Sequence, residues 1–210
     1  AHLMSTTALN HDEHAGHAKA SPATAKFGMI MFLISEGMLF AALITSYILL
    51  RWTEHGFPWQ ENYVWPPHGY PHLPILLTSI NTVLLVASSF AFHFSEVAVK
   101  KGKSGIPLLG LTIILGSAFV GVQVYEWMHL HHEGLWFNNG GVYGSTFFVI
   151  TGFHGAHVVI GVLLIVWCFL RQVLTRCFTP THHVALANVA LCWHFVDVIW
   201  ILLFVLLYWI

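Results

Sequence analysis

Long apolar runs separated by short polar segments make up the chain from residue 27 to residue 210. Each run exceeds the ~20 residues with which an α-helix crosses the ~30 Å hydrocarbon core of a bilayer. The runs cover residues 27–50, 73–99, 106–129, 143–170 and 183–210. The pattern therefore predicts an all-α, polytopic membrane protein, with five transmembrane helices in one domain over residues 27–210.

The first 26 residues have a different pattern, because they are polar, small and rich in histidine: His2, His11, His14 and His17. A segment of this kind cannot bury a hydrophobic core. We therefore expect residues 1–26 to be a flexible leader, and a weak metal-binding tail is the alternative.

Composition supports a membrane protein: 57% of the residues are hydrophobic and only 8% are charged, whereas soluble domains carry about 25% charged residues. The formal net charge is −1, and no basic stripe is visible. Nucleic acid is therefore not expected as a partner.

The basic residues are distributed unevenly between the two sides that five crossings define. One side receives Lys19, Lys26, Lys100, Lys101, Lys103, Arg171 and Arg176, and the other receives only Arg51. Positive charge stays on the cytoplasmic side of membrane proteins. The distribution predicts a cytoplasmic N-terminus and an external C-terminus.

Glu36 is the one acidic residue inside the first apolar run, close to the predicted bilayer midplane. A lone carboxylate there costs several kcal/mol unless it is protonated or paired. Glu96 and Glu126 lie nearer to the ends of their runs, where we expect them to reach interfacial water.

Candidate partners for Glu36 lie at a similar depth in the last two runs, as two pairs with i,i+3 spacing. These are His154 with His157, and His194 with Asp197. Residues at this spacing share one side of a helix. We expect the two pairs to meet Glu36 in the bundle interior as an intramembrane polar network.

Three interpretations of this network stay open. It is a structural network that fixes helix register, a proton-exchanging site centred on Glu36, or a haem or metal site that uses the histidines. The histidine pairs lack the Glu-x-x-His pattern of bundle metal sites, so neither a catalytic residue nor a metal ligand is assigned.

The chain resembles subunit III of the haem-copper oxidases in six ordered motifs. Two of them are specific: TGFHGAH at 151–157 and WHFVDVIW at 193–200. The others are ISE at 34–36, WPP at 65–67, INTVLL at 80–85 and YGSTFF at 143–148. The residues of these motifs resemble cytochrome c oxidases more closely than quinol oxidases. The segment Tyr125-Glu126-Trp127, followed by His129, is however also similar to the quinol oxidase branch.

The resemblance implies an accessory subunit without redox centres, in the short five-helix bacterial form that lacks the first two helices of the mitochondrial protein. Such a subunit packs beside oxidase subunits I and II, which hold the haem and copper, in the bacterial cytoplasmic membrane. It supports proton uptake and protects a proton-pumping, dioxygen-reducing enzyme from inactivation during turnover.

The resemblance also implies roles for two residues. Arg171 matches a position that meets a lipid phosphate, so bound phospholipid is expected, and Glu36 matches a carbodiimide-reactive glutamate. Two alternatives remain: subunit III of a quinol oxidase, and a membrane haem or metal protein that uses the intramembrane histidines.

Overall fold

A computed structural model describes residues 21–52, 74–138, 140–175, 177–179 and 183–209. Five long helices account for nearly all of them: α1 (Pro22–Trp52), α2 (Ile75–Lys100), α3 (Ile106–His132), α4 (Gly141–Thr175) and α5 (Val184–Phe204). A π-helical turn, Val205–Trp209, continues α5. Each helix is long and apolar enough to cross a membrane. The predicted all-α fold with five membrane spans is confirmed.

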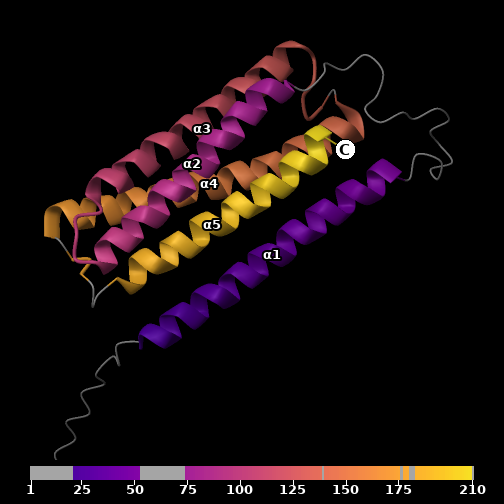
Figure 1. The fold of residues 1–210 in the computed structure, drawn as a ribbon. Coiled ribbons are helices and arrows are strands. Elements are labelled where there is room, and N and C mark those ends of the chain that lie inside the picture. Colours follow the sequence, from indigo (N-terminus) through magenta and orange to yellow (C-terminus); the bar gives the residue numbers. More distant parts are fainter. Residues whose placement is uncertain (1–20, 53–73, 139, 176, 180–182, 210) are drawn as a thin grey trace, which may run out of the picture.

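Four of the helices form a bundle, and the fifth lies against its outside. Helix α2 packs on α3 and α5, and α4 packs on α3 and α5. Helix α1 runs along α5, with a second contact to α4 (Figure 1). Only Phe40 and Tyr47 of α1 are buried, and Tyr47 belongs to a core cluster. Helix α1 therefore contributes little to the core and lies attached to its outside.

The centre of the bundle is built around Trp193 of α5, which is fully buried. Gly116 of α3 and Gly161 of α4 face its indole ring; a β-carbon would lie 2.9 Å and 2.8 Å, respectively, from ring atoms. The indole Nε1 donates a hydrogen bond to Ser88 Oγ on α2 at 3.1 Å. Small residues allow this close approach, as is common between membrane helices.

Helix α1 begins at Pro22, within the segment that the sequence pattern assigned to the leader. Ser21 caps the helix, because its Oγ accepts a hydrogen bond from the Thr24 amide at 3.1 Å. Serine at the cap followed by proline at the first helical position is a favourable helix start. The apolar run marks the membrane-spanning part of α1, whereas the cap marks its true beginning. The rest of the predicted leader, residues 1–20, lies outside the described residues.

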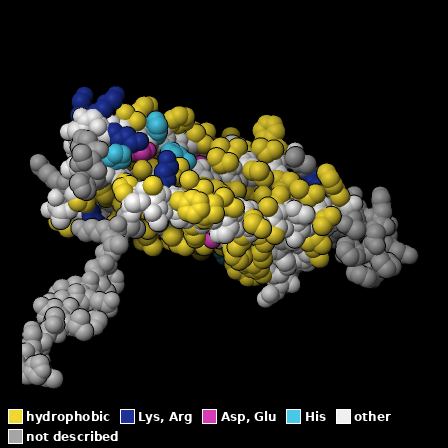
Figure 2. All heavy atoms as spheres, turned by 90° about the horizontal axis from the view of Figure 1, so that it is seen from below, with side chains coloured by type: hydrophobic (Ala, Val, Ile, Leu, Met, Phe, Trp, Pro, Cys, Tyr) yellow, Lys and Arg dark blue, Asp and Glu magenta, His cyan; other side chains and the backbone are white. Residues whose placement is uncertain are grey.

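Basic side chains gather at one end of the molecule, while hydrophobic side chains cover its length (Figure 2). This end is where α2 finishes and α1 and α5 begin (Figure 1). It carries Lys26, Lys100, Lys101 and Lys103, whereas Arg51 lies at the last turn of α1. The charge asymmetry noted in the sequence is therefore present in three dimensions.

Candidate functional site

Glu36 lies next to the midpoint of α1 and contacts α4. Its Oε2 is 2.9 Å from His157 Nε2, and both side chains are about four-fifths buried, with 20% exposed. Phe40, one turn further along α1, packs edge-on against the His157 ring at 5.0 Å between centroids. The pair is a polar connection between the attached helix and α4 of the bundle.

The contact of the second ring nitrogen of His157 determines where the protons of this pair lie. Nδ1 lies 2.7 Å from the backbone carbonyl of Phe153. A carbonyl only accepts, so Nδ1 carries a proton. The contact between Nε2 and Glu36 then holds one further proton, on either the nitrogen or the carboxyl oxygen. In both cases the pair as a whole is uncharged, which suits the interior of a membrane.

His194 and Asp197 meet on Ser89 of α2 instead of on Glu36. The Ser89 hydroxyl lies 2.7 Å from His194 Nδ1 and donates to Asp197 Oδ2. A serine has a single proton to donate, so His194 Nδ1 is the donor toward Ser89. The result is a three-residue hydrogen-bond chain that joins α2 to α5.

His154 lies apart from both groups, between aromatic side chains. Its ring stacks on Trp200 with centroids 4.7 Å apart, and Phe119 meets its edge. The imidazole is buried, and neither ring nitrogen has a hydrogen-bond partner among the described residues. The structure thus places the five predicted polar residues in three locations: Glu36 with His157, His194 with Asp197, and His154 among aromatic rings.

Glu126 was expected to reach interfacial water, and this expectation is wrong. The residue is fully buried in the bundle. Tyr208 donates to its Oε1 at 2.6 Å, Thr78 donates to the same oxygen at 3.1 Å, and Gln123 donates to Oε2 at 3.4 Å. Glu126 therefore links α2, α3 and the π-helical turn at the end of α5.

Arg171 lies near the end of α4, with its side chain exposed. Its guanidinium carbon is 5.1 Å from the centre of the Trp167 ring, which is within the range of a cation–π contact. The lipid-phosphate contact expected at Arg171 stays a prediction.

In the part of the chain that the structure describes, the histidines and acids do not converge on a point that could hold a metal ion. Within the described ranges, no three His, Cys, Asp or Glu side chains come close enough together to do so. Glu36–His157, Ser89–His194–Asp197 and the Glu126 cluster are hydrogen bonds that join helices. Such contacts can share protons and fix helices relative to one another.

Comparison with known proteins gives a consistent family. The family described as "Cytochrome c oxidase subunit III" matches residues 6–210. A "Cytochrome c oxidase subunit 3" of Thermostichus vulcanus is 40% identical, over 91% of this chain and 90% of the relative. The protein of that name from Synechocystis is 36% identical, over 98% and 87%. The echidna Tachyglossus aculeatus has one that is 38% identical, over 92% of this chain and 72% of its own length.

Proposed function

This chain belongs to the cytochrome c oxidase subunit III family, and from this membership we propose that it is the non-redox accessory subunit of a proton-pumping haem-copper oxidase. In this role it packs against subunit I, close to subunit II, and stabilises subunit I and its bound lipids. The partner subunits hold the haem and copper and reduce dioxygen to water.

Family membership carries this proposal, and the exposed apolar surface of α1 supports it. Although the helix is long, only two of its side chains are buried, and large apolar residues such as Ile34 and Met38 are 52% and 70% exposed. A surface of this kind is suited to contact with lipid or with another membrane subunit. It also carries Glu36, which places the Glu36–His157 pair next to that contact.

In this proposal the Glu36–His157 pair holds α1 in register on α4. In the first version of this proposal, the pair supports proton uptake in subunit I by keeping α1 in position. In the second version, Glu36 itself also exchanges protons. The two versions differ in Glu36→Gln. An amide can donate to His157 Nε2 but cannot release a proton at neutral pH. Retained proton uptake in this variant supports the positioning role, and lost uptake with normal assembly supports exchange.

We also propose that the N-terminus is cytoplasmic and that the membrane is the cytoplasmic membrane of a bacterium. The lysines at the start of α1 and the end of α2 support this orientation through the positive-inside rule. Labelling of a single cysteine introduced at Lys103 tests it. The residue should react in inverted vesicles and stay protected in intact cells.

Spectroscopy of the purified chain tests the non-redox assignment. An accessory subunit shows no haem absorption and no stoichiometric iron or copper, whereas the intact oxidase shows both. Haem bound in stoichiometric amount to this chain, with loss on His154→Phe or His194→Phe, would instead support the membrane haem protein alternative.

A further inference from the structure

A groove between α2 and α5 is formed by two adjoining cavities that share His93 and His194. The outer cavity, of about 440 Å³, lies at the basic end of the bundle and is also bordered by the start of α1. The inner cavity, of about 400 Å³, continues between the two helices toward the membrane centre. Together they have the size of a site for a small or medium-sized ligand.

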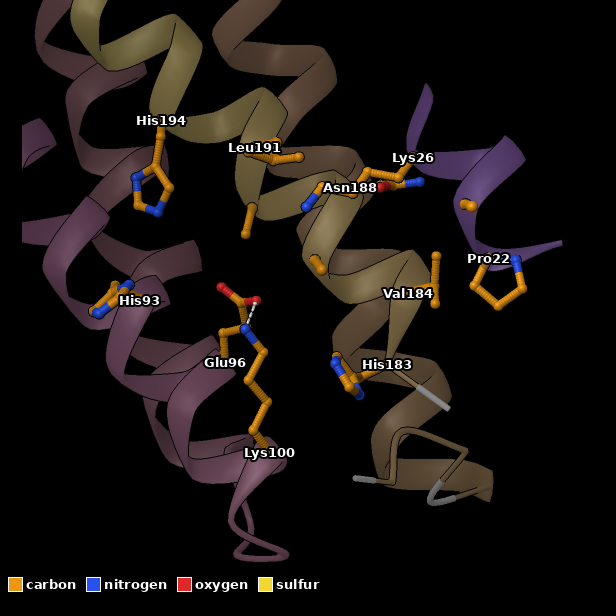
Figure 3. Close-up of a pocket in the computed structure, with 13 residues that line it drawn as sticks. Pro22, Lys26, His93, Glu96, Lys100, His183, Val184, Asn188, Leu191 and His194 are labelled. Carbon is orange, nitrogen blue, oxygen red and sulfur yellow. Dashed lines mark ion pairs between the residues drawn. The ribbon is translucent and has the colours of Figure 1, made fainter. Parts of the chain in front are cut away.

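The outer cavity is lined with charged and polar side chains from three helices. Figure 3 shows Glu96 and Lys100 of α2 across the cavity from Lys26 of α1, from Asn188 of α5 and from His183, which directly precedes α5. Lys100 Nζ is paired with Glu96 at 2.6 Å. Lys26 has no ion pair with any described residue, so the lining carries an uncompensated positive charge when its histidines are neutral. His183 adds a buried Nδ1 that has no hydrogen-bond partner in the described chain.

The exposed walls of the inner cavity are mainly apolar: Val86 and Phe90 of α2 and Val198 and Ile201 of α5. Polar residues also line it, namely His93, His194, Ser89 and Asp197, and the Asp197 carboxylate accepts the Ser89 hydrogen bond. Phe90 and Val198 are 61% and 62% exposed, so the cavity opens sideways to the lipid phase. The polarity of the groove therefore changes from charged at the end of the bundle to mainly apolar toward its middle.

The length of the groove matches one leaflet of a bilayer. Lys100 and Val86 mark its ends on α2, and fourteen helical steps of 1.5 Å separate them by about 21 Å. Half of a bilayer, headgroups included, is roughly 20–22 Å thick. A molecule with an anionic head and an apolar tail of this length fits the groove in both length and polarity.

We propose that the α2–α5 groove binds one anionic phospholipid from the leaflet at the basic end of the protein. Its phosphate lies near Lys26 and the His183 imidazole, and one acyl chain follows the apolar walls toward Ile201. Because Lys26 belongs to α1, the lipid also connects the attached helix to the bundle. Arg171 lines neither cavity, and the proposal does not depend on the oxidase role proposed above.

Native mass spectrometry of the full chain from nanodiscs tests this proposal, with phosphatidylglycerol, phosphatidylethanolamine and phosphatidylcholine in equal amounts. The wild-type chain should retain one phosphatidylglycerol preferentially. Lys26→Ala should lower this occupancy about fivefold, which is the contribution of one lysine near an anionic lipid. Lys103→Ala is the matched control, because it removes a lysine from the same end but not from the cavity, and it should change occupancy less than twofold.

Two more variants distinguish the lipid headgroup and the position of the acyl chain. Glu96→Gln removes the negative charge from the cavity and should raise phosphatidylglycerol occupancy; a decrease, with preference for phosphatidylethanolamine, would overturn the anionic assignment. Val198→Trp at the exposed rim should block the acyl chain and reduce retention as much as Lys26→Ala. Equal retention in Lys26→Ala and Lys103→Ala would overturn the proposal.

A photo-crosslinking residue at position 198 in the intact complex tests the identity of the occupant. Capture of lipid supports the proposal. Capture of another protein subunit means that the groove is a protein interface, and would overturn it.

Discussion

Helix α1 and the four-helix bundle are held in place by different kinds of contact. In the bundle, glycines on α3 and α4 bring two helices against Trp193, and polar side chains such as Glu126 are fully buried and bonded from several elements. On α1, polar contacts to the bundle include Glu36 with His157 and the Ala25 carbonyl with Asn188. Buried apolar contact is confined to one strip, where Tyr47 packs into a core cluster and Phe40 meets Phe195. The bundle is fixed by packing around its whole centre, whereas α1 is fixed by a narrow strip of packing and by interhelical hydrogen bonds.

Because of this difference, the folding stability of the bundle and the attachment of α1 to it should respond to different substitutions. In lipid the hydrophobic effect does not drive helices together, so close packing and interhelical hydrogen bonds must do so. Loss of packing in the bundle should therefore unfold the protein, while loss of a polar contact on α1 should detach that helix and leave the bundle folded.

Gly116→Leu should be the most destabilising of these substitutions, by about 3 kcal/mol or more, because an added side chain overfills a close-packed core. Its β-carbon would already lie 2.9 Å from the Trp193 ring. Gly121→Leu on the same helix is the control, since nothing lies within 4 Å of a β-carbon there. Thermal unfolding in detergent measures both; equal loss in the two variants would contradict the packing account.

Glu126→Ala should cost about 2 kcal/mol, because it leaves the buried hydroxyl of Tyr208 without its acceptor. The Thr78 hydroxyl can still donate to the Pro74 carbonyl. Glu126→Gln keeps one acceptor oxygen in place and should cost less. The same unfolding measurement compares them. A Glu126→Ala variant as stable as the wild type would mean that the hydrogen-bond cluster contributes nothing to the bundle.

Glu36→Leu should weaken the attachment of α1 by about 1 kcal/mol, which is in the range of interhelical hydrogen bonds in membranes, without lowering the unfolding temperature of the bundle. Spin labels at the exposed residues Met38 and Ile160 report the distribution of distances between α1 and α4. This distribution should be broader in Glu36→Leu than in the wild type. Glu36→Gln should keep the wild-type distribution, and so should the control Ser46→Ala, whose hydroxyl bonds only within α1. A broad distribution in the control would show that the method, rather than Glu36, causes the change.

Arg171→Ala should have the smallest effect on folding, about 0.5 kcal/mol, because an exposed cation–π contact contributes little. Unfolding temperature measures this directly. A large loss of stability would contradict the position of Arg171 at the surface of α4.

The hydrophobic pattern predicts the five spans because crossing a bilayer demands length and apolarity, and both can be read from sequence. It does not locate the start of α1, since the Ser21 cap and Pro22 contribute no hydrophobicity. The position of Glu126 near the end of its apolar run also gave the wrong expectation that this residue reaches water. The buried residues Gly116, Phe119, Gln123, Glu126 and Leu130 recur every three or four positions, and that spacing indicates the inner face of α3.

The partners of the polar residues were only partly visible in the sequence. His154 and His157 share one side of α4, but three helical steps still rotate one relative to the other by about 60°. This rotation sends His157 toward α1 and Glu36, and His154 into the bundle toward Trp200. Which helix faces each residue depends on the tertiary arrangement, so the separation into three locations required the structure.

The proposed accessory role makes a direct prediction about the oxidase during turnover. Initial dioxygen reduction and the number of turnovers before inactivation should be measured in the complex with and without this chain. The account predicts a largely unchanged initial rate and far fewer turnovers without the chain. An immediate loss of dioxygen reduction together with haem absorbance, or an unchanged number of turnovers, would contradict it.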